Sequence, residues 1–149
     1  TGVGECSVCP VKTSSASGSN KLTDCKCMAG HNGTSDGSLC TACDAGEYKV
    51  ATGVGRCSTC PVGTSSASGS NELIDCKCMA GYNGTSDGAA CTACDAGEYK
   101  VATGVGECSV CPVKTSSASG SRSNELTDCK CMAGHNGTEY KAATGTGQC

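Results

Sequence analysis

The sequence predicts a small disulfide-rich fold, in which tandem modules of short β-hairpins and loops form an elongated rod with little or no helix. Three observations support this fold class: 17 of the 149 residues are cysteine, Phe and Trp are absent, and the sequence repeats with a period of 51 residues. Large aromatic side chains dominate the energetics of ordinary cores, and the 22 glycines add chain entropy that folding must overcome. A disulfide that closes a loop of about 15 residues stabilises by roughly 3 kcal/mol. Disulfides are therefore expected to replace a hydrophobic core.

The repeat defines three modules, since residues 1–51 and 52–102 differ at only eight positions. We expect modules at residues 1–40, 43–91 and 94–149, of which only the second is complete and unaltered. The third gains two residues near Arg122 and lacks twelve that correspond to the sequence SDGAACTACDAG. The first lacks its opening cysteine, which would lie in a CDAGEYKVA segment ahead of Thr1. We therefore expect the chain to be cut from a longer array.

Each module contains residues that are typical of turns and loops. Asn32-Gly33 and Asp36-Gly37, which both recur in the second module, are typical hairpin-turn dipeptides. The serine-rich stretches, such as residues 13–19, are expected to be solvated polar loops rather than sites of O-glycans. Only two residues, Thr41-Ala42 or Thr92-Ala93, separate neighbouring modules. Such short linkers between near-identical modules predict near-identical joints, and hence a stiff rod or a shallow screw.

The cysteine pattern of the second module resembles that of an epidermal-growth-factor-like (EGF-like) module. The C-x-C pair Cys76-Lys-Cys78 is followed by Met-Ala-Gly-Tyr and by a glycine-rich turn before Cys91, as in the C-terminal part of that family. More narrowly, residues 40–82 resemble the cysteine-rich repeat of ephrin-receptor ectodomains and its many secreted relatives. His31 and His135 depart from the family pattern, because EGF-like modules have an aromatic residue there.

The EGF-like resemblance implies a disulfide pattern in which the first cysteine pairs with the third, the second with the fourth and the fifth with the sixth. The implied bonds are Cys6–Cys25, Cys27–Cys40, Cys43–Cys60, Cys57–Cys76, Cys78–Cys91, Cys94–Cys111, Cys108–Cys129 and Cys131–Cys149, with Cys9 left unpaired. Six cysteines allow 15 connectivities, so their spacing alone does not choose among them. The main alternative joins cysteines in sequence order, as Cys43–Cys57, Cys60–Cys76 and Cys78–Cys91, and would leave Cys6 unpaired instead.

Metal binding, cofactors and catalysis are not expected. Pairs of the C-x2-C and C-x-C types can hold zinc, but each repeat has six cysteines rather than a multiple of four, and no His lies near them at ligand spacing. The calcium-binding EGF-like form has acidic or amide residues just before the first cysteine, whereas Cys-Thr-Ala precedes Cys43 here, so no calcium is expected. His31 and His135 take the place of Tyr82, which indicates a packing role rather than acid–base chemistry, and no enzyme activity is expected.

Charge and composition indicate an extracellular protein, secreted or at the cell surface. The net charge of −3 comes from intermingled acidic and basic residues, so no nucleic-acid partner is expected. No apolar run approaches the roughly 18 residues of a membrane span. Dense cysteine favours an oxidising compartment. Asn32, Asn83 and Asn136 each begin an Asn-Gly-Thr acceptor motif. N-linked glycans are therefore expected at these positions, because an exposed turn can carry a glycan.

Two function classes follow from this organisation. The first is an extracellular structural repeat protein, a disulfide-stapled and glycosylated spacer that self-associates into a filament, a matrix or an appendage of the flagellar-hair type. The second is a stalk or recognition segment of a receptor or adhesin that binds a protein partner. The first is favoured, because recognition surfaces usually concentrate aromatic or Arg anchors, which are few and evenly spread here.

Overall fold

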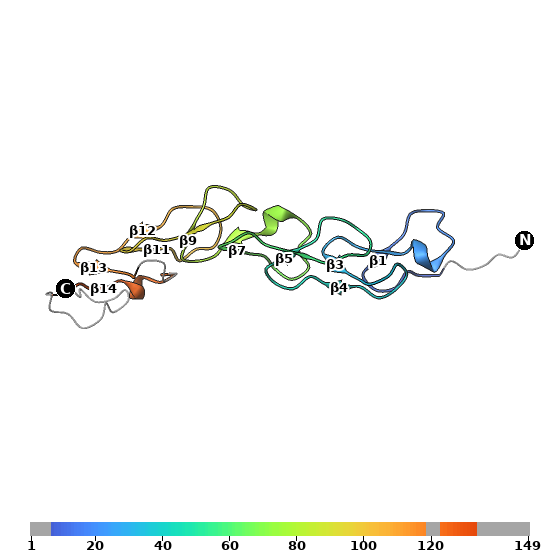
Figure 1. Ribbon diagram of the computed structural model, residues 1–149, viewed down its shortest axis with the longest axis horizontal. Helices are drawn as coiled ribbons and strands as arrows, with labels where there is room; N and C mark the ends of the chain where they lie inside the picture. Colours follow the sequence, from blue (N-terminus) through green and yellow to red (C-terminus); the bar gives the residue numbers. More distant parts are fainter. Residues whose placement is uncertain (1–6, 119–122, 134–149) are drawn as a thin grey trace, which may run out of the picture. The chain divides into compact units, whose positions relative to one another are not determined.

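The computed structural model describes residues 7–118 and 123–133, and every strand within them is two residues long. The strands pair into antiparallel two-stranded sheets, and the only helices of this part of the chain are single 3₁₀ turns (Figure 1). The 3₁₀ helices are η1 (Leu22–Asp24), η2 (Leu73–Asp75) and η3 (Leu126–Asp128). The predicted small disulfide-rich fold of short hairpins with little or no helix is confirmed.

Three kinds of strand pair recur along the chain. In the first kind a Thr-Ser strand pairs with a Lys-Cys strand: β1 (Thr13–Ser14) with β2 (Lys26–Cys27), β7 (Thr64–Ser65) with β8 (Lys77–Cys78), and β13 (Thr115–Ser116) with β14 (Lys130–Cys131). In the second kind β3 (His31–Asn32) pairs with β4 (Thr41–Ala42), and β9 (Tyr82–Asn83) with β10 (Thr92–Ala93). In the third kind β5 (Glu47–Tyr48) pairs with β6 (Ser58–Thr59), and β11 (Glu98–Tyr99) with β12 (Ser109–Val110). An isolated two-stranded hairpin is marginal in water, so these pairs depend on the disulfides beside them.

Cysteine forms the interior of the described chain. Every buried hydrophobic residue there is a cysteine, and Cys27, Cys43, Cys76, Cys78 and Cys129 are fully buried. The larger aliphatic side chains are instead exposed, with Val8 at 93 % and Val113 at 88 %. The disulfides therefore occupy the place that aliphatic and aromatic side chains take in an ordinary domain.

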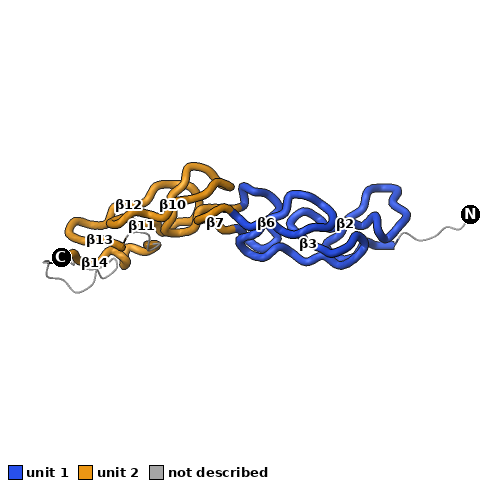
Figure 2. The backbone as a smooth tube through the Cα atoms, in the orientation of Figure 1, with its two compact units in different colours: residues 1–60, 66–75 blue, residues 61–65, 76–149 orange. Residues whose placement is uncertain are grey.

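The chain divides into two compact units (Figure 2). Unit 1 contains residues 1–60 and 66–75, and unit 2 contains residues 61–65 and 76–149. The boundary falls inside the second predicted module, residues 43–91, whose β5–β6 pair lies in unit 1 and whose β7–β8 pair lies in unit 2. The division into modules 1–40, 43–91 and 94–149 stays a prediction.

Two local expectations are corrected. Asn32-Gly33 is not a hairpin turn, because Asn32 belongs to β3 and Gly33 forms a bridge with Gly55. A side chain at Gly33 would place its Cβ 2.5 Å from the Cys27 sulfur, so glycine is needed there for close packing on a disulfide. The turn is formed by Asp36-Gly37, where Gly37 has a φ of +78°. The expected linker Thr41-Ala42 is strand β4, which pairs with β3.

Candidate functional site

Six disulfides among the described residues join cysteines in sequence order. The bonds are Cys9–Cys25, Cys27–Cys40, Cys43–Cys57, Cys78–Cys91, Cys94–Cys108 and Cys111–Cys129. Cys60, Cys76 and Cys131 are also disulfide-bonded. The predicted bonds Cys27–Cys40 and Cys78–Cys91 are confirmed.

The remaining EGF-like predictions are wrong where the structure tests them. These are Cys6–Cys25 with Cys9 unpaired, Cys43–Cys60, Cys57–Cys76, Cys94–Cys111 and Cys108–Cys129, each of which conflicts with a bond above. The predicted bond Cys131–Cys149 reaches outside the described residues, as does Cys6.

Strand pairing explains why the disulfides join cysteines in sequence order. The β5–β6 register sets Glu47 opposite Thr59, and the N–H of Cys60 donates to the carbonyl oxygen of Gly46 at 2.8 Å. Cys57 meanwhile lies with its Cα 5.7 Å from that of Cys43, within the usual range for a disulfide. The two cysteines of the C-x2-C pair therefore serve different loops, and each bond closes the short loop between neighbours.

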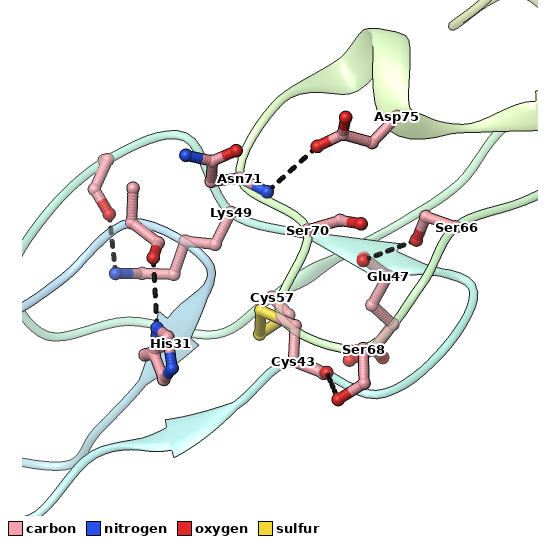
Figure 3. Close-up of a disulfide and its surroundings, with 12 residues drawn as sticks. His31, Cys43, Glu47, Lys49, Cys57, Ser66, Ser68, Ser70, Asn71 and Asp75 are labelled. Carbon is pink, nitrogen blue, oxygen red and sulfur yellow. Dashed lines mark hydrogen bonds between the residues drawn. A yellow bond between two sulfur atoms is a disulfide. The ribbon is translucent and has the colours of Figure 1, made fainter. Parts of the chain in front are cut away.

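The contacts that hold successive segments together in unit 1 centre on residues 43–49, and we call these contacts the joint (Figure 3). Gly46 donates its N–H to the carbonyl oxygen of Ser66 at 3.0 Å, and the Ser66 hydroxyl donates to the carbonyl oxygen of Glu47 at 2.8 Å. Lys49 donates its N–H to the carbonyl oxygen of Ser70 at 3.2 Å. The serine-rich loop at residues 66–70 thus binds the Glu-Tyr-Lys segment through its backbone.

Two further donors of the same serine-rich loop reach the start of the segment. The hydroxyl of Ser68 and the N–H of Gly69 both donate to the carbonyl oxygen of Cys43, at 2.8 and 2.9 Å. Ser66 is only 8 % exposed as a result. The expectation that the serine-rich stretches are solvated loops is therefore wrong for this copy.

Residues 43–49 also contact the turn at Gly30. Gly30 donates its N–H to the carbonyl oxygen of Lys49 at 2.8 Å and accepts from the N–H of Cys43 at 2.8 Å. A Cβ at Gly30 would lie 2.1 Å from the carbonyl oxygen of Gly69. The joint therefore brings three segments together, and residues 43–49 hydrogen-bond to both of the others.

Unit 2 contains the same joint. Gly97 donates its N–H to the carbonyl oxygen of Ser117 at 3.1 Å, and the Ser117 hydroxyl donates to the carbonyl oxygen of Glu98 at 2.7 Å. Lys100 donates its N–H to the carbonyl oxygen of Ser123 at 3.0 Å. Ser123 therefore takes the place of Ser70, so the hydrogen bond to the lysine N–H is kept despite the two-residue insertion near Arg122.

A buried lysine ammonium completes each joint, and sequence reasoning missed it. Lys49 and Lys100 are each 6 % exposed. The Lys49 ammonium donates to the carbonyl oxygens of Ala51 and Gly53, at 2.7 Å each, and the Lys100 ammonium donates to those of Tyr82 (2.9 Å) and Gly104. Burial lowers the pKa of Lys100 below its ordinary value. These cations stabilise the turn that follows the Glu-Tyr strand.

The predicted glycan acceptors lie on strands beside the joint. Asn32 is in β3 and Asn83 in β9; both are half-buried, and the threonines that complete their acceptor motifs, Thr34 and Thr85, are exposed. Within the described residues neither Asn side-chain amide forms a hydrogen bond. Asn136 lies outside the described residues.

His31 and the cysteines do not assemble into a reactive cluster. The Nδ1 atom of His31 lies 3.0 Å from the carbonyl oxygen of Ala29, so the ring is engaged with its own turn. In residues 7–118 and 123–133, no group of three or more His, Cys, Asp or Glu side chains is placed to hold a metal ion. Over the same residues, no helix is long and apolar enough to cross a lipid bilayer.

Comparison with known proteins adds no relative: no family model matches this chain, and no curated protein matches it significantly.

Proposed function

We propose that the chain is an extracellular structural repeat protein, a disulfide-stapled spacer that contributes to a filament, an appendage or a matrix, and that it is not an enzyme. The observation that supports this proposal most directly is the recurrence of the joint. Units 1 and 2 each bind a Glu-Tyr-Lys segment with a serine-rich loop through equivalent backbone hydrogen bonds. Arrays of such units gain stability from each repeat and from its contact with the next.

The dense disulfides support the extracellular location, because such bonds persist in oxidising compartments. N-glycosylation at Asn32 and Asn83 is part of the proposal, and it is supported by their uncommitted side-chain amides. A mass decrease on treatment with an N-glycosidase, lost in part in the Asn83→Gln variant, would support it; an unchanged mass in material from a eukaryotic secretory source would refute it.

The resemblance to ephrin-receptor-like repeats enters the proposal only as a similarity in cysteine spacing. The sequential bonds depart from the EGF-like pairing, so we do not extend the function of EGF-like modules to this chain. The second candidate, a stalk or recognition segment of a receptor or adhesin, rests on the same spacing.

Negative-stain microscopy of the native source and of the purified chain tests the structural role. Regular fibres or a matrix that incorporates the chain would support the proposal. A chain that stays soluble and binds one partner protein with a defined stoichiometry would instead favour the recognition role.

A further inference from the structure

The glycan acceptor of unit 1 lines an open hollow of about 510 Å³. The lining consists of residues 32–34, which are the acceptor motif Asn-Gly-Thr, and residues 54–56. The two stretches meet at a backbone bridge, in which the N–H of Gly55 donates to the carbonyl oxygen of Gly33 at 3.3 Å. The volume of the hollow lies within the range of roughly 300–1,000 Å³ that is typical of small-molecule sites.

The alternation of side chains along the strand directs the acceptor toward this hollow. A Cβ at Gly33 would lie 2.5 Å from the Cys27 sulfur and 3.2 Å from the Cys40 sulfur, so this position faces the disulfide. Successive residues of an extended strand point to opposite faces, and the side chains of Asn32 and Thr34 therefore point away from the disulfide. A glycan on Asn32 would begin on the face that carries the hollow.

Val54 provides an apolar surface beside the acceptor. The antiparallel bridge sets Val54 opposite Thr34 and Arg56 opposite Asn32, on the same face. Val54 is 51 % exposed, so half of an apolar side chain is left uncovered where the glycan would begin.

Unit 2 repeats this arrangement around Asn83. Gly84 and Gly106 donate their N–H groups to each other's carbonyl oxygens, at 3.4 and 3.0 Å. Val105 takes the place of Val54 and is likewise 51 % exposed. The same valine therefore lies beside the acceptor in both units.

The charged residue of the lining differs between the units, and this difference indicates the chemistry of the occupant. Arg56 in unit 1 corresponds to Glu107 in unit 2, and both are exposed. An anionic or a cationic ligand would suit only one of the two. A neutral ligand with hydroxyl groups suits both, because a hydroxyl accepts from the Arg56 guanidinium and donates to the Glu107 carboxylate.

We propose that the first N-acetylglucosamine of an N-linked glycan on Asn32 binds in this hollow and covers Val54, and that the same sugar on Asn83 covers Val105. The methyl group and the C–H bonds of this sugar pack on the valine, while its hydroxyls bond to the charged residue or to water. The sugar thereby shields the backbone bridge beside it. This inference rests on the proposed N-glycosylation and gives the first sugar a stabilising contact with the protein.

Hydrogen exchange of the Gly55 N–H tests the contact, measured by NMR on the full chain made with ¹⁵N-glycine in a eukaryotic secretory host. Three forms are compared: the untreated glycoprotein, a form trimmed by an endoglycosidase to a single N-acetylglucosamine, and the sugar-free variant Asn32→Gln. Exchange in the first two forms should be equally slow, and about fivefold slower than in Asn32→Gln. Covering the exposed half of a valine side chain changes an equilibrium constant by about that factor. The Gly106 N–H in unit 2 is the internal reference and should not change.

A substitution in the lining separates the contact from a general effect of the glycan. Val54→Ser should reduce the difference between the trimmed and the sugar-free forms to less than twofold. Val50→Ser is the matched control, because Val50 is 62 % exposed but lies outside the lining, and it should keep the fivefold difference.

The outcomes distinguish this inference from the proposed function. A bare Asn32, detected by mass spectrometry, would overturn both the contact and the proposed glycosylation of that residue. A glycosylated Asn32 with equal Gly55 exchange in all three forms, or with protection lost on trimming to one sugar, would overturn the contact alone. Protection that rises with protein concentration in Asn32→Gln would show that a second copy covers the hollow, and would also overturn it.

Discussion

The Cys57→Ser variant tests the sequential disulfide order directly. Cys57 bonds to Cys43 at a sequence separation of 14, so the substitution should leave Cys43 as the new free thiol. A disulfide that closes a loop of about 15 residues contributes about 3 kcal/mol by restricting the unfolded chain. The free energy of unfolding of unit 1, measured with guanidinium chloride, should therefore fall by about 3 kcal/mol. Ser58→Ala, a change at the exposed neighbouring residue, should leave it nearly unchanged.

The position of the new thiol is read by differential alkylation. Free thiols are labelled before reduction, the remaining cysteines are labelled afterwards with a second reagent, and the chain is digested with trypsin. Cleavage after Lys26, Lys49, Arg56 and Lys77 yields the peptides 27–49 and 57–77. If the disulfides follow the sequence order, peptide 27–49 of the Cys57→Ser variant should gain a label from the first reagent, because it contains Cys43.

The EGF-like order predicts a different product, because Cys57 would then bond to Cys76. A new label on peptide 57–77 would refute the pairing described here and the loop-closing explanation for it. A correct label without a loss of stability would refute the view that these bonds replace a hydrophobic core.

Three further predictions concern backbone geometry and the buried lysine. Gly30→Ala should lower the free energy of unfolding by about 2–4 kcal/mol, because the new Cβ would lie 2.1 Å from the carbonyl oxygen of Gly69 at a φ of +77°. Gly18→Ala should lower the free energy of unfolding by only about 1 kcal/mol, because Gly18 has a φ of +85° but open space around it, so only backbone strain is added. Equal losses of stability for Gly30→Ala and Gly18→Ala in thermal unfolding would contradict the packing argument. Lys12→Gly should raise the free energy of unfolding by about 0.5 kcal/mol, since Lys12 has a φ of 64°. A lower free energy of unfolding in denaturant titration would show that the lysine side chain contributes more than its backbone strain costs. Burial lowers the pKa of Lys100 from 10.5, so at a pH between the folded and the unfolded pKa the unfolded chain binds more protons than the folded chain. The free energy of unfolding, compared with that of Lys100→Met, should therefore rise with pH in that window. A difference that stays flat or falls would contradict the burial of the ammonium.

Serine-rich loops show where the sequence analysis stopped short. Residues 13–19 and 64–70 have the same sequence, TSSASGS, yet Ser15 is exposed and Ser66 is buried. Nothing in the composition of the loop distinguishes the two, because the difference lies in whether a Glu-Tyr-Lys segment is bound against it. The unbroken identity of this stretch between copies was the one available sign that it does more than connect strands.

The sequence by itself determined the class of the fold. Disulfides were the expected means of stabilisation, because the sequence has seventeen cysteines, no Phe or Trp and a 51-residue period. The exposure of the valines in the structure agrees with that expectation. The recurrence of the elements also followed from the sequence, because each copy carries the same local residues and therefore forms the same short strands.

Only the tertiary structure decided the pairing of the cysteines and the existence of the joint. Spacing leaves 15 connectivities open for six cysteines, and the choice depends on which backbones approach to within disulfide distance, as Cys43 and Cys57 do at 5.7 Å between Cα atoms. The burial of Lys49 and Ser66 likewise depends on carbonyl oxygens that any residue could provide. Backbone hydrogen bonds have no signature in side-chain identity, so contacts made through them become visible only when the chain is folded.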